Sequence, residues 1–294
     1  MSVYQLSKNQ IARFNDEGYL IIRNFYSLAE IEPLQKALAD DPSINGSLYG
    51  MNGDSEVPHP INIWNKCGDD IAGMVPRMER TIDATEALLD DECYHWHSKF
   101  VVKRPKCPAI IGWHQDYASW YDDGLLYPNM LSIGTAITAA TKENGCTQVI
   151  PGSHKMGLLD DGARSKNKTF TARLKHAKEK LGIVYCELDP GDVMIFHCNL
   201  LHGADGNTTD QTRAIIFSSY NARGNAPITG TQGINKEGEF LNISREQRQY
   251  CKLEKVPDDA LIKGQYKSAF NHTKFIPPKA GLDDSFTRGV KLST

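Results

Sequence analysis

Short apolar segments separated by Gly- and Pro-containing turns fill residues 99–220, and this pattern constrains the fold more than any other feature. The turns include Asn144-Gly145, Pro151-Gly152 and Pro190-Gly191. Segments of this length, bounded in this way, predict β-strands. The expected strands cover residues 99–103, 110–117, 131–139, 147–150, 183–187, 192–197 and 213–220.

The first hundred residues have a different pattern. Apolar residues recur at helical spacing over residues 7–17, 27–40 and 71–89, and residues 19–25 read as a strand. Gly18 ends the first helix and Ser27 is a good N-cap for the second. We therefore predict a mainly β protein with flanking helices (α+β), namely a double-stranded β-helix, or cupin-like jelly roll, buttressed by N-terminal helices.

The length of 294 residues and the hydrophobic content of 40% suit one domain over residues 1–294. We expect a helical buttress with entry loops in residues 1–95, the jelly-roll core in 96–222 and a C-terminal extension in 223–294. Residues 160–180 are polar and predict a surface insertion with a helical second half. Whether this insertion or the C-terminal tail covers a site stays open.

Charge and composition exclude several classes of partner. The 33 basic and 36 acidic residues give a net charge of −3, which creates no field for nucleic acid or an anionic membrane. No apolar run reaches the roughly 20 residues of a membrane span, and the first residues lack the apolar stretch of a signal peptide. The seven cysteines include no Cys-x-x-Cys pair, so we expect reduced thiols. These features favour a cytoplasmic monomer or homodimer whose partner is a small-molecule substrate.

Three residues form a candidate metal centre. In an extended strand, side chains two apart point to the same side, so His114 and Asp116 can present an imidazole and a carboxylate to one ion. His202 adds a third ligand. Two His and one carboxylate on one face of an octahedron leave open positions, as in non-haem Fe(II) oxygenases, where a co-substrate and O2 occupy them.

Arg213 lies eleven residues after His202, at the start of the last predicted strand. Its planar guanidinium can bind a carboxylate through two hydrogen bonds. An oxoacid co-substrate that chelates iron needs such a cation at its far end. The sequence thus combines a candidate iron site with a candidate oxoacid anchor.

At these residues the sequence resembles the phytanoyl-CoA dioxygenase-like family of Fe(II)- and 2-oxoglutarate-dependent oxygenases, and within it the ectoine hydroxylase branch. The matching segments are Trp113-His-Gln-Asp116, Glu143-Asn-Gly-Cys146, Ile150-Pro-Gly-Ser-His154, Pro190-Gly-Asp-Val193, His202-Gly203 and Arg213. The resemblance implies that His114, Asp116 and His202 bind Fe(II), and that Arg213 pairs with the distal carboxylate of 2-oxoglutarate. It also implies that a hydroxyl on the following strand, Ser132, helps hold that carboxylate.

Further site residues are expected around this centre. Lys99 and Lys103 precede the iron motif on one face of a strand, and either could reach the co-substrate; His97 is an alternative to Lys99. The family often has Gln or Asn on that strand, and Phe100, Val101 and Val102 stand here instead. The role of this strand in co-substrate binding is therefore open.

Four residues are candidate substrate contacts. Trp120, four residues past Asp116, offers an indole face for a cationic substrate group, with packing as the alternative. Asn62 and Trp64 belong to a segment that either lines the cavity or covers the barrel as an ordered loop. Asn221, just beyond the Arg213 strand, is a further candidate.

Four other residues are assigned structural roles. His197 is interpreted as a core or neighbouring histidine, because the spacing to Gly203 and Arg213 favours His202 as the ligand. His154 is expected in a turn, Asp192 as a cap of the Pro190-Gly191 turn, and Cys198 as a packed thiol.

The predicted function is that of a dioxygenase that hydroxylates an unactivated carbon of a small polar or zwitterionic compound and releases succinate and CO2. Suitable compounds are an amino acid derivative, an aminophosphonate or an ectoine-like solute. The alternatives are a natural-product tailoring oxygenase acting on a larger scaffold, and a metal-binding jelly roll without oxygenase activity. A zinc hydrolase can use the same three ligands, but nothing in it would require Arg213.

Overall fold

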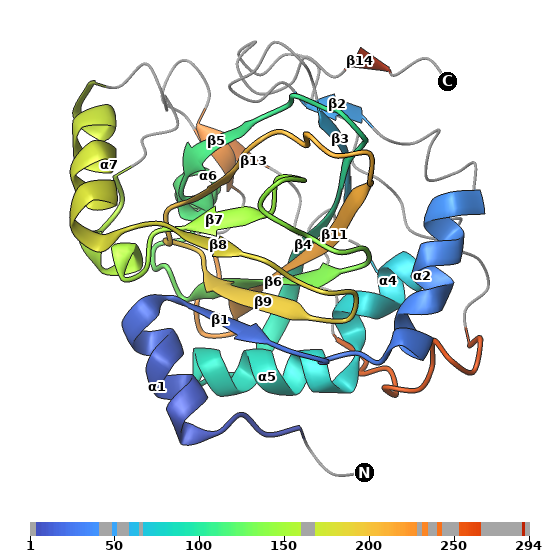
Figure 1. The fold of residues 1–294 in the computed structure, drawn as a ribbon. Coiled ribbons are helices and arrows are strands. Elements are labelled where there is room, and N and C mark those ends of the chain that lie inside the picture. Colours follow the sequence, from blue (N-terminus) through green and yellow to red (C-terminus); the bar gives the residue numbers. More distant parts are fainter. Residues whose placement is uncertain are drawn as a thin grey trace.

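Two antiparallel sheets form the centre of the protein (Figure 1). The computed structural model describes residues 4–40, 49–51, 59–64, 67–159, 168–227, 231–234, 240–242, 253–265 and 290–291. The larger, eight-stranded sheet contains, in spatial order, β1 (Tyr19–Ile22), β9 (Val193–His197), β6 (Met130–Ala136), β11 (Arg213–Ala222), β4 (Cys93–Lys103), β3 (His59–Trp64), β2 (Tyr49–Met51) and β14 (Val290–Lys291). The smaller sheet contains β5 (Ile111–His114), β10 (His202–Ala204), β7 (Thr147–Val149) and β8 (Val184–Cys186). A separate pair joins β12 (Thr231–Ile234) to β13 (Phe240–Asn242).

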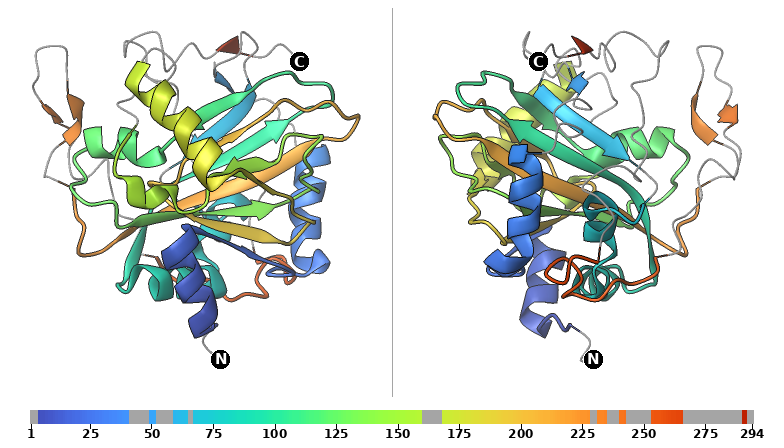
Figure 2. Two further views of the ribbon diagram at one scale, coloured as in Figure 1. Left: turned by 60° about the vertical axis from the view of Figure 1, so that its left-hand side comes forward. Right: turned by 90° about the vertical axis from the view of Figure 1, so that its right-hand side faces the viewer.

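Helices flank both sheets. The large sheet is covered by α1 (Lys8–Glu17), α2 (Leu28–Asp40), α4 (Ile71–Met74), the 3-10 helix η1 (Val75–Arg77) and α5 (Glu79–Leu89) (Figures 1 and 2). Beside the small sheet, away from α2, lies α7 (Lys168–Leu181), which packs through Phe170 and Ala177 (Figure 2). The remaining short helices, α6 (Asp116–Asp122) and η2 (Ser153–Met156), lie in the connections next to the small sheet.

Local sequence accounts for the first helix and its end. Ser7 and Gln10 form a capping box in which each side chain bonds to the backbone of the other. Gly18 ends the helix with φ of 80°, a left-handed conformation that glycine adopts without a Cβ clash. The predicted helix over residues 7–17 is confirmed.

The predicted continuous helix over residues 71–89 is wrong. It is broken into α4, η1 and α5, because Met78 is extended, with φ of −57° and ψ of 134°. At Met78 the chain pairs with a distant segment around Val256: the Val256 amide donates to Arg77 O over 2.8 Å, and the Glu79 amide donates to Val256 O over 3.0 Å. A long-range contact of this kind is not visible in a local pattern.

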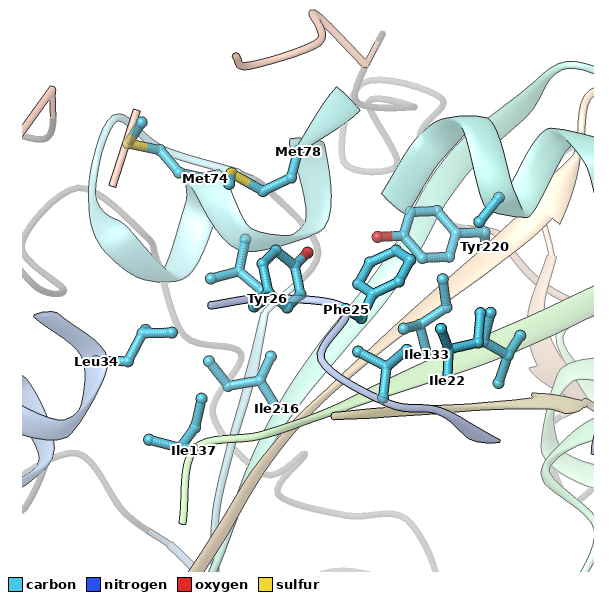
Figure 3. Packing of buried hydrophobic residues seen from close by; sticks show 14 of the residues in the cluster. Ile22, Phe25, Tyr26, Leu34, Met74, Met78, Ile133, Ile137, Ile216 and Tyr220 are labelled. Carbon is cyan, nitrogen blue, oxygen red and sulfur yellow. The ribbon is translucent and has the colours of Figure 1, made fainter. Parts of the chain in front are cut away.

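The two faces of β11 have different surroundings. Ala214, Ile216 and Tyr220 belong to the main hydrophobic cluster between the large sheet and the helices (Figure 3). Side chains alternate along a strand, so Arg213, Ile215, Phe217 and Ser219 point to the other face, toward the small sheet. There Ile215 packs with residues of both sheets. The space between the sheets is therefore where inward side chains of β4, β6 and β11 meet those of β5, β7 and β10.

The predicted jelly roll with N-terminal helices is confirmed. The helical second half of residues 160–180 is confirmed as α7, while residues 160–167 lie outside the described part of the chain. The same is true of most of the predicted C-terminal extension, of which residues 253–265 pack against α5 and η1. No helix among the described residues is both long and apolar enough to cross a membrane.

Candidate metal centre and its surroundings

The structure brings His114, Asp116 and His202 together. One ligand atom from each lies within 4.8 Å of the others, the only such cluster of metal-binding side chains found among the described residues. His114 ends β5 and pairs in register with His202, which begins β10. The carboxylate oxygens of Asp116 lie 3.5 Å from Nε2 of His114 and 3.9 Å from Nε2 of His202.

The local geometry differs from the predicted strand over residues 110–117. β5 ends at His114, Gln115 is extended with φ of −115° and ψ of 124°, and Asp116 is the first residue of α6. One extended residue between the two ligands is enough to turn both side chains to the same side. The helix start then carries the chain away from the cluster.

Backbone carbonyls orient both imidazoles. Nδ1 of His114 lies 2.8 Å from Gly112 O, and Nδ1 of His202 lies 2.9 Å from Leu200 O. A carbonyl only accepts, so each Nδ1 carries the hydrogen and each Nε2 presents its lone pair to the cluster. Burial, reinforced by His114, lowers the pKa of His202 to about 3. His202 is therefore neutral, as a metal ligand must be.

Asp116 is ionised in a buried position. Burial by itself would raise its pKa, but the neighbouring Lys99 ammonium helps to hold the pKa of this carboxyl well below its usual range. Nζ of Lys99 lies 3.4 Å from Oδ1 of Asp116. The cluster thus offers two lone-pair nitrogens and an anionic oxygen, a donor set suited to a divalent transition metal.

Arg213 is buried at the other end of the same interior face. It is 1% exposed, and its Nη2 donates to Oγ1 of Thr147 over 3.2 Å. Its Nε and Nη1 are buried without a hydrogen-bond partner in the described part of the chain. Burial lowers the pKa of Arg213 to about 10, so the side chain remains a cation at neutral pH. Two unsatisfied, charged donors side by side fit a carboxylate ligand.

Lys103 is next to Arg213, but its ammonium group binds backbone carbonyls. The two residues pair in register on β4 and β11. Nζ of Lys103 donates to Ala109 O over 3.1 Å and also to Asp205 O. Burial, with Arg213 adjacent, lowers its pKa to about 7. The side chain ties the loop after β4 to the end of β10, while Lys99 points to the metal cluster.

Ser132 lies far from Arg213 along the sheet. It pairs with Ser219 of β11, and their hydroxyls are 2.8 Å apart. Ser219 is six residues from Arg213 in β11, which corresponds to roughly 20 Å of extended strand. Ser132 therefore cannot hold the same carboxylate as Arg213. The hydroxyl beside Arg213 belongs to Thr147, which the sequence pattern did not indicate because it lies on the other sheet.

Two predicted substrate contacts lie on the opposite face of the large sheet, and a third, Asn221, is held by neighbouring residues. Trp64 packs in the main hydrophobic cluster, and Asn62, two residues earlier in β3, shares its face, which is the helix-covered side of the large sheet. The segment is a paired strand, not a loop over the barrel. Asn221 donates to Tyr94 Oη and to Asn225 O, so its amide holds the turn after β11.

Trp120 is packed near the metal cluster. It is 3% exposed and belongs to a small apolar cluster with Tyr117, Leu125, Met130 and Cys198. Its ring lies edge-on to His97, with 5.5 Å between ring centroids. Trp120 thus packs within this cluster, and its role as a substrate contact stays a prediction.

Gln115 and Asn199 form a buried amide pair that the sequence pattern did not reveal. The Gln115 amide donates to Oδ1 of Asn199 over 2.9 Å and to Gly157 O over 2.9 Å, and its Oε1 accepts from Leu159 N over 2.7 Å. Gln115 lies between two ligands, and Asn199 precedes the third by three residues. The pair therefore links both ligand segments to residues 157–159.

The four residues with predicted structural roles lie outside the metal cluster. His197 is outside the metal cluster, and burial lowers its pKa to about 4. His154 lies in η2. Asp192 accepts from Asp189 N over 2.9 Å across the turn and also binds Arg23. Cys198 is buried in the cluster around Trp120.

The fold and the site define a jelly-roll protein with a His-x-Asp and a distant His arranged around one point, opposite a buried arginine. The chain belongs to the phytanoyl-CoA dioxygenase (PhyH) family, whose model matches residues 14–215. Its relatives include an ectoine dioxygenase from Sphingopyxis alaskensis, 29% identical over 274 residues, which cover 86% of this chain and 87% of that protein. They also include an L-proline trans-4-hydroxylase from Streptomyces griseoviridis, 27% identical over 176 residues, which cover 54% of this chain and 66% of that protein.

Solved structures are similar over most of the chain. EctD from S. alaskensis in its apoform matches with a TM-score of 0.67 and 26% identity, covering 86% of this chain and 89% of that chain. The same protein with bound Fe matches with a TM-score of 0.64, 26% identity and coverage of 81% and 87%. Its complex with 2-oxoglutarate and 5-hydroxyectoine matches with a TM-score of 0.65, 26% identity and coverage of 86% and 89%.

Proposed function

We propose that this protein is an Fe(II)- and 2-oxoglutarate-dependent dioxygenase that hydroxylates an unactivated carbon of a small polar or zwitterionic substrate. One observation carries the proposal: a cluster of two imidazoles and a carboxylate shares an interior face with a buried, partly unsatisfied arginine. A hydrolytic or purely metal-binding site would not need the arginine. Family membership and the dioxygenase and hydroxylase names of the relatives support the same activity.

His114, Asp116 and His202 would hold the iron. Their protonation states suit this role, because Asp116 is ionised and His202 is neutral near pH 7. When bound, iron and 2-oxoglutarate together supply O2 activation, which yields succinate, CO2 and a hydroxylated product. The contribution of the chain is to orient the ligands through Gly112 O and Leu200 O and to keep bulk water out of a buried site.

Arg213 would bind the distal carboxylate of 2-oxoglutarate through Nε and Nη1. Thr147 holds the third donor atom, Nη2, and so fixes the plane of the guanidinium. Along the interior face, the metal cluster would then follow Arg213, and Lys99 lies beside Asp116. Lys99 would balance the Asp116 charge and lies within reach of a ligand bound at the metal.

The substrate would bind on the far side of the metal from Arg213. Along β4 and β11, the inward residues beyond Lys99 are His97 and Ser219, and Ser132 of β6 adjoins Ser219. Nε2 of His97 is buried without a hydrogen-bond partner among the described residues, and burial holds the pKa of His97 well below its usual range. This wall therefore offers neutral donors and acceptors, which favour a small polar compound over a long apolar one.

A turnover assay tests the proposal. The protein would be supplied with Fe(II), ascorbate and 2-oxoglutarate, and succinate would be measured against a panel of cyclic imino acids, amino acid derivatives, aminophosphonates and ectoine. We expect one class to stimulate succinate release and to gain one oxygen atom by mass spectrometry. Asp116→Ala should abolish both signals. Metal binding without 2-oxoglutarate consumption under any condition would contradict the proposed activity.

A further inference from the structure

A second group of reactive side chains lies on the helix-covered side of the large sheet. Cys67, between β3 and α4, is partly exposed, and its Sγ lies 3.4 Å from Nδ1 of His95. The other ring nitrogen, Nε2, lies 2.7 Å from Oγ of Ser98. That hydroxyl donates to Oγ of Ser218 over 3.0 Å. The four side chains form one continuous chain of hydrogen bonds, from a partly exposed thiol into the sheet.

The direction of these bonds fixes the tautomer of His95. A serine hydroxyl has one hydrogen, and Ser98 donates it to Ser218. Oγ of Ser98 must then accept from His95, so Nε2 carries the ring hydrogen. Nδ1 consequently presents its lone pair to Cys67. The thiol proton therefore has a base placed to receive it.

The base is held in position. His95 is 2% exposed, and its ring packs edge-on against Tyr220 with 6.1 Å between centroids. Ser98 fixes the ring from the other side. A nucleophile next to a base that a third group orients is the arrangement of activated cysteines.

Other described cysteines lack this environment. Burial raises the pKa of Cys93, Cys186 and Cys198, and raises that of Cys146 to about 12. Thiols of this kind are poor nucleophiles, because the thiolate is the reactive form. Cys198 lies 3.9 Å from Nδ1 of His197 but is buried, whereas Cys67 is partly exposed and lies 3.4 Å from its imidazole acceptor.

We propose that Cys67, activated by His95, is a reactive thiol that is oxidised by hydroperoxides. Cys67 is only partly exposed, which favours a small electrophile over a bulky one. The thiol proton passes to Nδ1 of His95, and the thiolate attacks one peroxide oxygen, so that an S–O bond forms and the O–O bond breaks. The departing hydroxide takes the proton from the imidazolium. The sulfur is oxidised by two electrons to a sulfenic acid, and hydrogen peroxide is reduced to water.

The test compares Cys67 with Cys107 in the full-length protein. Cys107 is also a partly exposed cysteine, which makes it a matched control. After brief exposure to hydrogen peroxide and trapping with dimedone, peptide mass spectrometry would give the rate at each cysteine. At pH 7 we expect Cys67 to react about tenfold faster than Cys107, and His95→Gln to remove that difference. Equal rates in the wild-type protein would overturn the proposal.

A pH series on the wild-type protein keeps the test independent of whether the His95 variant folds. Alkylation of Cys67 by iodoacetamide should approach its maximal rate at a lower pH than alkylation of Cys107, because His95 favours the thiolate. Superimposable pH curves would refute activation by His95. An unchanged rate in a His95→Gln protein with a native circular dichroism spectrum would refute it as well.

Discussion

Replacement of Arg213 by Met tests where the co-substrate is held. Thr147 accepts from Nη2 only, and Nε and Nη1 have no partner in the described part of the chain. If these atoms bind the distal carboxylate of 2-oxoglutarate, the substitution removes two charge-assisted hydrogen bonds, each worth about 1.5–3 kcal/mol. The loss is then at least about 3 kcal/mol, which raises the Kd for 2-oxoglutarate by at least about 100-fold.

Anaerobic isothermal titration of the Fe(II) protein with 2-oxoglutarate measures this Kd. Denaturant unfolding of the same variant without co-substrate is the control. Met has a similar length and removes a buried charge, so we expect Arg213→Met to be as stable as the wild-type protein or more stable. A Kd within about tenfold of the wild-type value, in a variant of unchanged stability, would refute the role of Arg213 as anchor.

Three further predictions concern neighbouring residues. Thr147→Val should weaken 2-oxoglutarate binding. Ser132→Ala should leave the Kd for 2-oxoglutarate unchanged and raise the KM of the primary substrate. Steady-state kinetics with both compounds measures the two effects, and the same effect in both variants would contradict the prediction. Gln115→Leu removes several buried hydrogen bonds, so it should lower the free energy of unfolding by about 2–4 kcal/mol and weaken Fe(II) binding. Urea unfolding and metal titration measure these two effects. If neither changes, the amide pair is dispensable. Burial lowers the pKa of His197 to about 4 and that of His202 to about 3 in the folded protein. In the unfolded chain both histidines have the ordinary pKa of about 6.5, so below this pH the unfolded chain binds more protons than the folded protein. The metal-free protein should therefore lose stability as the pH falls from about 6.5 toward 4. His197→Gln should flatten this pH dependence in denaturant titrations, and an equally steep curve would assign the effect to other groups.

The metal cluster could be predicted from the sequence because most of its geometry is local. His114 and Asp116 are separated by one residue, and any extended conformation at Gln115 turns both side chains the same way. That argument holds although Asp116 begins a helix and does not continue the strand. The third ligand required only that β10 lie beside β5, an arrangement that the jelly roll provides.

The surrounding residues could not be predicted because their positions depend on strand register. Ser132 and Arg213 are both inward-facing, but the pairing of Ser132 with Ser219 separates them along the sheet. Trp64 was expected near the cavity, yet β3 pairs with β4 in a register that turns it to the helix-covered face. Thr147 approaches Arg213 from the other sheet. A single sequence contains no signal for contacts of this kind.

The most direct test of the central claim is an anaerobic titration of the Fe(II)-loaded protein with 2-oxoglutarate, followed by visible absorption. If His114, Asp116 and His202 hold iron with open positions, and Arg213 anchors the far carboxylate, the weak charge-transfer band of the iron–oxoacid chelate should appear and saturate. The band should require a far higher co-substrate concentration in Arg213→Met. Iron binding without any band at saturating 2-oxoglutarate would contradict the claim that this site is an oxygenase centre.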